Sequence, residues 1–155
     1  MNILILGAGQ SLRGDDAVGL ETVRLWREQF PETARGVRVE LSELPGLALL
    51  ELLDGMDAAI LVDAVHSSAP AGTLHRLGPD ELASFTPGSG SAHGWGVAET
   101  LQLGRSLYPA LANCRVTLLG IEAGQVEMGA GLSQAVRETL PDAARLLEQE
   151  VRSLL

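Results

Sequence analysis

Residues 2–20, "NILILGAGQSLRGDDAVGL", decide the fold. The apolar run 2–7 predicts a buried strand, and the periodic pattern over residues 15–30 predicts an amphipathic helix. The glycine-rich turn between them has the outline of a phosphate-binding loop, yet it ends in two aspartates, Asp15 and Asp16. A strand, a glycine turn and a helix are the first unit of an α/β fold, and the question is what the aspartates bind.

The rest of the chain continues the alternation of strands and helices. Residues 31–36 are expected to interrupt the pattern, and Pro141 is expected to break or restart the last helix. The order predicts one domain over residues 1–155, an α/β fold with three layers. Its twisted, mostly parallel sheet has about five strands, with one antiparallel edge strand and helices on both faces. The further strands are expected at 38–42, 57–64, 71–78 (the edge strand) and 115–124, and the further helices at 45–56, 79–85 (one turn), 97–108 and 131–155.

The composition restricts the partners of this chain. Its 155 residues carry a net charge of −9, with a pI near 4.7. Nucleic-acid and anionic-membrane surfaces attract basic proteins, so neither is expected as a partner. No apolar run approaches the roughly 20 residues that span a bilayer, and no signal-peptide pattern is present. We therefore expect a cytoplasmic protein, and we expect it to be a monomer.

The glycine turn does not fit a nucleotide site. Leu12 stands where G-x-G-x-x-G needs its third glycine. Gly9 and Gly14 have P-loop spacing, but Asp15 and Asp16 replace the lysine and the hydroxyl residue that follow. Carboxylates repel phosphate and attract cations.

Three side chains are expected at one edge of the sheet. Ligands of parallel sheets bind beyond the carboxyl ends of the strands. Asp16 follows the first strand, Asp63 ends the strand 57–64, and His93 lies in the Gly/Ser-rich loop 86–96. Two carboxylates and an imidazole can form a zinc or nickel site with open positions. Taken singly, each residue also has an ordinary structural interpretation: a helix-dipole residue, a turn cap and a solvated histidine.

Other polar residues have weaker assignments. Asp15 is expected to cap the helix, and His75 to be a structural residue of its strand. His66 is a candidate outer contact of the site or of the substrate, and Glu122 is a candidate for shaping the cleft. Catalysis by serine or cysteine is not expected, because the sole cysteine, Cys114, begins a strand and no G-x-S-x-G elbow is present.

Four stretches together resemble the hydrogenase maturation proteases, the endopeptidases that trim the C-terminus of the large subunit of nickel–iron hydrogenases. The resemblance covers nearly the whole chain and departs at Gln10, Ala17 and Ala123, where the family usually has Asn, Gly and Pro. The stretches are "GAGQSLRGDDAVG" (7–19), "LVDA" (61–64), "SAHGWGVAETL" (91–101) and "LLGIEAGQVEMGAGLSQAVRETLP" (118–141).

This resemblance implies a function and a site. It implies a metal-dependent endopeptidase, of aspartic or metallo type, that removes the C-terminal extension of a hydrogenase large-subunit precursor after nickel insertion. The catalytic and metal-contacting residues fall on Asp16, Asp63 and His93, with Asp16 as the candidate base. Nickel would be carried in by the substrate, and zinc or cadmium can occupy the site in vitro. Two alternatives stay open: a nickel-binding assembly chaperone that does not cleave, and a degenerate nucleotide-binding module.

Overall fold

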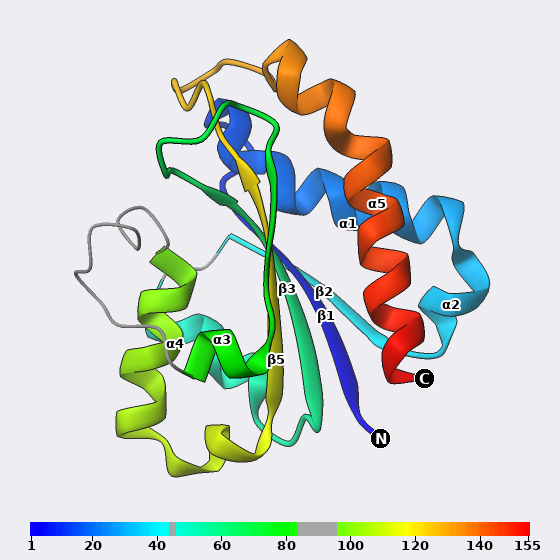
Figure 1. The fold of residues 1–155 in the computed structure, drawn as a ribbon, viewed down its shortest axis with the longest axis vertical. Coiled ribbons are helices and arrows are strands. Elements are labelled where there is room, and N and C mark those ends of the chain that lie inside the picture. The colour runs from blue at the N-terminus through cyan, green and yellow to red at the C-terminus, as the bar shows by residue number, and fades with distance from the viewer. Residues whose placement is uncertain (44–45, 84–95) are drawn as a thin grey trace.

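The computed structural model describes residues 1–43, 46–83 and 96–155 (Figure 1). Within these ranges five strands form one sheet in the order β2-β1-β3-β5-β4. The first four of these run parallel, and β4 pairs antiparallel with β5 at the edge. The mostly parallel sheet with an antiparallel edge strand is therefore confirmed. The strands are β1 (Ile3–Ala8), β2 (Arg38–Ser42), β3 (Ala58–Val65), β4 (Leu74–Leu77) and β5 (Arg115–Glu122).

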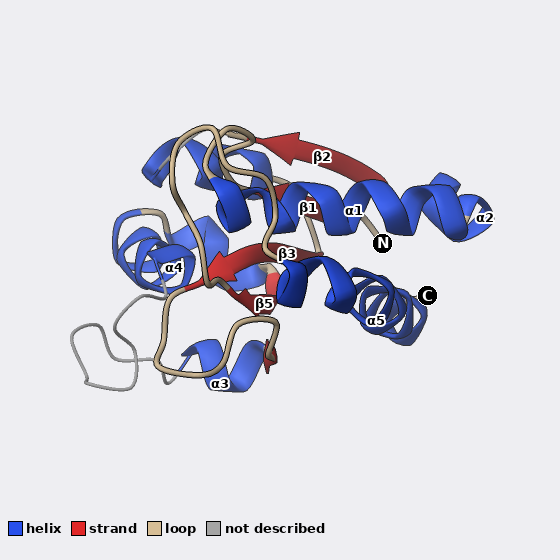
Figure 2. Cartoon of the chain, turned by 90° about the horizontal axis from the view of Figure 1, so that it is seen from above, coloured by secondary structure: helices blue, strands red, loops and turns tan. Residues whose placement is uncertain are grey.

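Helices cover both faces of the sheet, as expected (Figures 1 and 2). One face carries α1 (Val18–Gln29) and α5 (Gln134–Leu154), with α2 (Pro31–Arg35) beyond the end of α1. The other face carries α3 (Pro79–Ala83) and α4 (Gly96–Leu107). Two 3₁₀ helices, Gly46–Leu53 and Pro109–Asn113, pack against α4 on this second face. None of the described helices has the length and hydrophobicity needed to cross a membrane.

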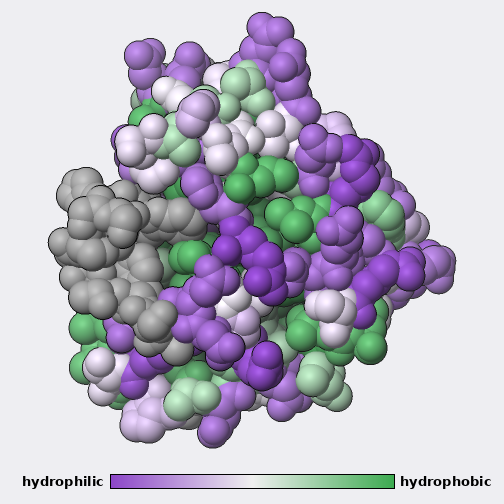
Figure 3. Space-filling model, in the orientation of Figure 1, coloured by the Kyte–Doolittle hydropathy of each residue, from purple (hydrophilic) through white to green (hydrophobic). Residues whose placement is uncertain are grey.

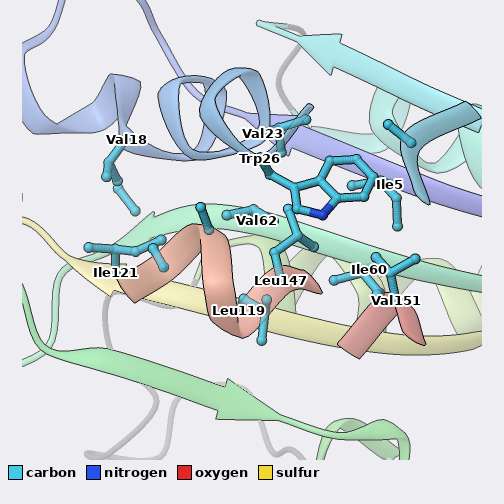
Figure 4. Close-up of a cluster of buried hydrophobic side chains, with 14 of the residues drawn as sticks. Ile5, Val18, Val23, Trp26, Ile60, Val62, Leu119, Ile121, Leu147 and Val151 are labelled. Carbon is cyan, nitrogen blue, oxygen red and sulfur yellow. The ribbon is translucent and has the colours of Figure 1, made fainter. Parts of the chain in front are cut away.

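The two faces of the sheet bury two separate apolar clusters. Under α1 and α5, Trp26 lies among Ile5, Ile60 and Leu147 (Figure 4). Its indole Nε1 donates a hydrogen bond of 2.8 Å to the buried Glu148 carboxylate, which satisfies the one polar atom of the ring. The second cluster lies under α4 and is built mainly from leucines. On the face seen in Figure 3, hydrophilic residues cover most of the surface.

Two local expectations were wrong, and the helix expected at 45–56 is present in 3₁₀ form. Residues 31–35 form the short helix α2, because Pro31 at its first turn lacks only an N–H that the helix does not need there. The segment 45–56 contains a 3₁₀ helix, Gly46–Leu53. Helix α5 continues through Pro141. Val136 before the proline and Leu147 after it both pack into the cluster under α5, and this packing offsets the lost backbone bond.

Candidate functional site

A cavity of about 250 Å³ opens beyond the carboxyl ends of β1 and β3. Its walls come from the turn after β1, the end of β2, and the first turn of α4. Three carboxylates line it: Asp16, Glu43 and Asp63. The sequence analysis placed Asp16 and Asp63 at one edge of the sheet, and they line the same cavity. Glu43 was missed, although it directly follows β2 and the sheet-edge rule could have found it.

Gly9 sets the position of Asp16. Its φ of +151° lies in a region that side chains disfavour, and a Cβ there would lie 2.0 Å from the Asp16 carbonyl oxygen. The backbone therefore turns tightly, and Gln10 N–H donates to the same carbonyl at 3.3 Å. Asp16 sits in the 3₁₀ turn Gly14–Ala17 with its side chain 27% exposed. Glycine at position 9 therefore permits the tight turn that brings Asp16 to the cavity.

Asp63 is a perturbed acid. Desolvation by burial, with a smaller contribution from the negative charge of Asp16, raises its pKa to about 8, while the Ala64 N–H bond opposes this shift. That N–H donates to Asp63 Oδ1 at 2.8 Å. In the protein alone, Asp63 therefore keeps its proton at neutral pH. Such perturbed groups in a cavity are typical of functional sites.

Asp15 has a structural role that differs from the expected helix cap. Its carboxylate is fully buried and accepts hydrogen bonds from Gly124 N–H, Gln125 N–H, Ser133 N–H and Ser133 Oγ, at 2.8, 2.9, 2.6 and 2.8 Å. Burial raises the pKa of Asp15, but these bonds outweigh it and leave the pKa below the usual value. Asp15 thus ties the loop after β1 to the loop that precedes α5, whereas its neighbour Asp16 faces the cavity.

The loops after β1 and β2 are also joined. Ser11 N–H and Ser11 Oγ donate to Glu43 Oε1 at 2.7 and 2.9 Å, and the Gln10 amide donates to the Glu43 carbonyl at 2.8 Å. The bonds from Ser11 lower the pKa of Glu43. Gln10, which stands where the family usually has Asn, therefore retains an amide hydrogen bond in this turn.

The other two departures from the family pattern are compatible with the backbone. Ala17 has a φ of −82°, so its position does not need glycine. Ala123 N–H donates to the Val65 carbonyl at 2.9 Å, a bond that proline could not make.

Of the three histidines, His66 lies beside Asp16, with 4.0 Å between its Nε2 and Asp16 Oδ1. His75 is on β4, where its Nε2 lies 3.1 Å from Glu122 Oε1. His93 lies outside the described residues, so its expected approach to the two aspartates stays a prediction. Among residues that the structure describes, no three His, Cys, Asp or Glu side chains are grouped closely enough to hold a metal ion.

Two further residues can be placed by their burial. Glu122 is 1% exposed and bonded to Ser67 and His75, so it supports a loop and is closed to a substrate. Cys114 is buried, which raises the pKa of its thiol to about 11. A thiol of this pKa is a poor nucleophile at neutral pH, which disfavours Cys114 as a catalytic group.

The fold and cavity define an α/β protein with an acidic site at the carboxyl edge of a parallel sheet. A sequence model of the hydrogenase maturation protease family matches residues 44–150. The chain is 32% identical to the hydrogenase expression/formation protein HoxM of Azotobacter vinelandii, over 94% of this chain and 70% of that protein. It is 30% identical to the hydrogenase 2 maturation protease of Escherichia coli, over 99% and 91% of the two chains.

Solved structures agree with this relationship. The hydrogenase maturating endopeptidase HybD from E. coli superposes with a TM-score of 0.75 at 25% identity, covering 99% of this chain and 93% of that one. The chain belongs to the hydrogenase maturation protease family, whose members are peptide-bond hydrolases.

Proposed function

We propose that this protein is the endopeptidase that removes the C-terminal extension of a nickel–iron hydrogenase large-subunit precursor after nickel insertion. The observation that carries the proposal is the cavity that Asp16 and Asp63 share, in a chain of this family. We place the reaction in the cytoplasm and expect the enzyme to act as a monomer.

The residues present suit a divalent cation. Carboxylate oxygens and imidazole nitrogens are ligands of zinc and nickel, and Asp16, Glu43 and Asp63 offer carboxyl oxygens to a cation in the cavity. We assign Asp16, Asp63 and His93 to contact the nickel that the precursor carries. Zinc or cadmium can take its place in vitro. No nucleic acid or membrane enters this reaction.

The chemistry follows from the two aspartates. Hydrolysis forms a bond between the water oxygen and the scissile carbonyl carbon, and breaks the bond from that carbon to nitrogen. Asp16 is the base that accepts a proton from the attacking water, and this proton then passes to the leaving nitrogen. Asp63, protonated in the protein alone, would release its proton to solvent on contact with a cation. The nickel carried by the substrate would polarise the carbonyl or the water.

The test is incubation of the purified protein with nickel-loaded precursor, with the mass of the precursor as the readout. We expect the wild type to shorten the precursor, and Asp16→Ala and Asp63→Ala to lose this activity while they keep their circular dichroism spectrum. Glu32→Ala is the matched control, because Glu32 is an acidic residue of α2 with an 84% exposed side chain. A stable complex with unchanged precursor mass would contradict the proposal and would identify a chaperone that does not cleave.

A further inference from the structure

We propose that His66 is a further cation-contacting residue of this site and shares its ion with Asp16. The inference rests on the proposed function, since Asp16, the neighbour of His66, lines the cavity of the proposed site. It adds a histidine that directly follows β3, three residues after Asp63.

The geometry brings His66 within reach of a shared ion. Its Nε2 lies 4.0 Å from Asp16 Oδ1. Two ligand atoms at about 2.1 Å from one Zn²⁺ or Ni²⁺ ion stand about 3.0 to 3.5 Å apart, for octahedral to tetrahedral angles. A rotation that closes the gap by less than about 1 Å would let both atoms bind one ion. The side chains of His66 and Asp16 are 46% and 27% exposed, so they can make this movement and the ion can reach them.

The loop that carries His66 is held from both ends by Glu122. Ser67, the residue after His66, donates its hydroxyl to the Glu122 carboxylate. At the other end, Gly72 N–H donates to the Glu122 carbonyl at 2.8 Å, and Glu122 N–H donates to the Thr73 carbonyl at 2.9 Å. Glu122 is 1% exposed.

A buried carboxylate costs free energy unless hydrogen bonds compensate it. For the Glu122 carboxylate, one of these hydrogen bonds comes from Ser67 in the loop. The bond therefore fixes the loop at Ser67 and stabilises the buried carboxylate. Because Ser67 follows His66 directly, the bond from Ser67 limits where the imidazole can go. The bond therefore holds the loop backbone at His66 near Asp16, and only the exposed side chains need to move to share an ion.

The experiment is zinc titration of the purified protein, followed by NMR of the imidazole nitrogens. The chain has only three histidines, and His66→Gln identifies the signals of His66. We expect the His66 Nε2 signal to shift as zinc is added, and this shift to disappear in Asp16→Asn. We expect His66→Gln to weaken zinc binding by about tenfold.

Ser67→Ala tests the anchoring of the loop. It should weaken zinc binding in the same direction but by less than His66→Gln. Ser68→Ala is the matched control, because Ser68 is the exposed next residue of the same loop and should leave the affinity unchanged.

A His66 signal that stays in place at millimolar zinc chloride overturns the inference, as does a shift that persists in Asp16→Asn. Either result leaves the proposed function standing if the wild type cleaves the nickel-loaded precursor and Asp16→Ala does not. Conversely, failure to cleave would overturn the proposed function while the zinc-dependent shift of His66 could still be observed.

Discussion

Replacing Asp15 with alanine is expected to destabilise the protein far more than the same change at its neighbour Asp16. The Asp15 carboxylate is fully buried and accepts four hydrogen bonds, two of them from Ser133. Asp16 is partly exposed, and His66 Nε2 lies 4.0 Å from its Oδ1. The two adjacent aspartates therefore differ in their surroundings: Asp15 is part of a buried hydrogen-bond network, and Asp16 lines the cavity of the proposed site.

The magnitude follows from the donors that Asp15→Ala would leave behind. Hydrogen bonds to a charged group contribute about 1.5 to 3 kcal/mol each, although they are not additive. Each buried donor left without an acceptor costs about 1 to 3 kcal/mol, so the loss of this network should lower the unfolding free energy by about 3 to 5 kcal/mol. For a chain of this length the melting temperature should fall by roughly 10 to 15 °C. Asp15→Asn keeps one acceptor oxygen and should lose about half as much, whereas Asp16→Ala should lose less than about 1 kcal/mol.

Urea denaturation followed by circular dichroism measures these differences. The pKa of Asp15 is lowered on folding, so its charge stabilises the native state above the unfolded pKa, and this stability is lost as the pH falls through the folded pKa. The deficit of Asp15→Asn should therefore be full at pH 6 and should shrink below about pH 4. Equal losses for Asp15→Ala and Asp16→Ala, or a deficit that does not depend on pH, would refute this reasoning.

Three more substitutions test the account. In metal-free protein, Asp63→Asn should gain stability relative to wild type as the pH rises from 4 to 9, by up to about 5 kcal/mol. The reason is that folding raises the Asp63 pKa to about 8, so the wild type loses stability as this group ionises. A difference in unfolding free energy between the two proteins that stays constant with pH in urea titrations would count against the raised pKa. Thr22→Val should stabilise the protein by about 1 kcal/mol, since Thr22 Oγ1 is buried without a hydrogen-bond partner in the described part of the chain; a lower melting temperature would show that the hydroxyl is bonded. Gly19→Ala should cost about 3 kcal/mol or more, because its Cβ would lie 2.2 Å from the Val62 carbonyl oxygen; an unchanged urea midpoint would show that α1 can move away from the sheet.

The sheet and its functional edge could be predicted because their signals are local. The apolar runs of β1, β3 and β5 are bounded by glycine and polar residues, and parallel strands end at a common edge. This rule brought Asp16 and Asp63 together across 47 positions of sequence, and both line the cavity.

The partners of Asp15, Glu122 and His66 could not be predicted in this way. Asp15 bonds to residues 109 to 118 positions away, and its position next to a helix start equally indicated a cap. Pro141 has an interior position in α5 that local rules disfavour, and only packing against α1 and the sheet explains it. The sequence could place His66 in the loop after β3 but not beside Asp16, because that loop is bonded to the distant Glu122.

The most direct test of the central claim compares precursor from nickel-replete cells with precursor from nickel-starved cells. Each is incubated with the purified protein, and its mass is measured over time. The account predicts that the nickel-loaded precursor loses a C-terminal peptide while the nickel-free precursor and casein stay intact, because the ion that Asp16 and Asp63 contact arrives with the substrate. Equal cleavage of both precursors would contradict this claim and would indicate a resident metal, zinc first, in the cavity.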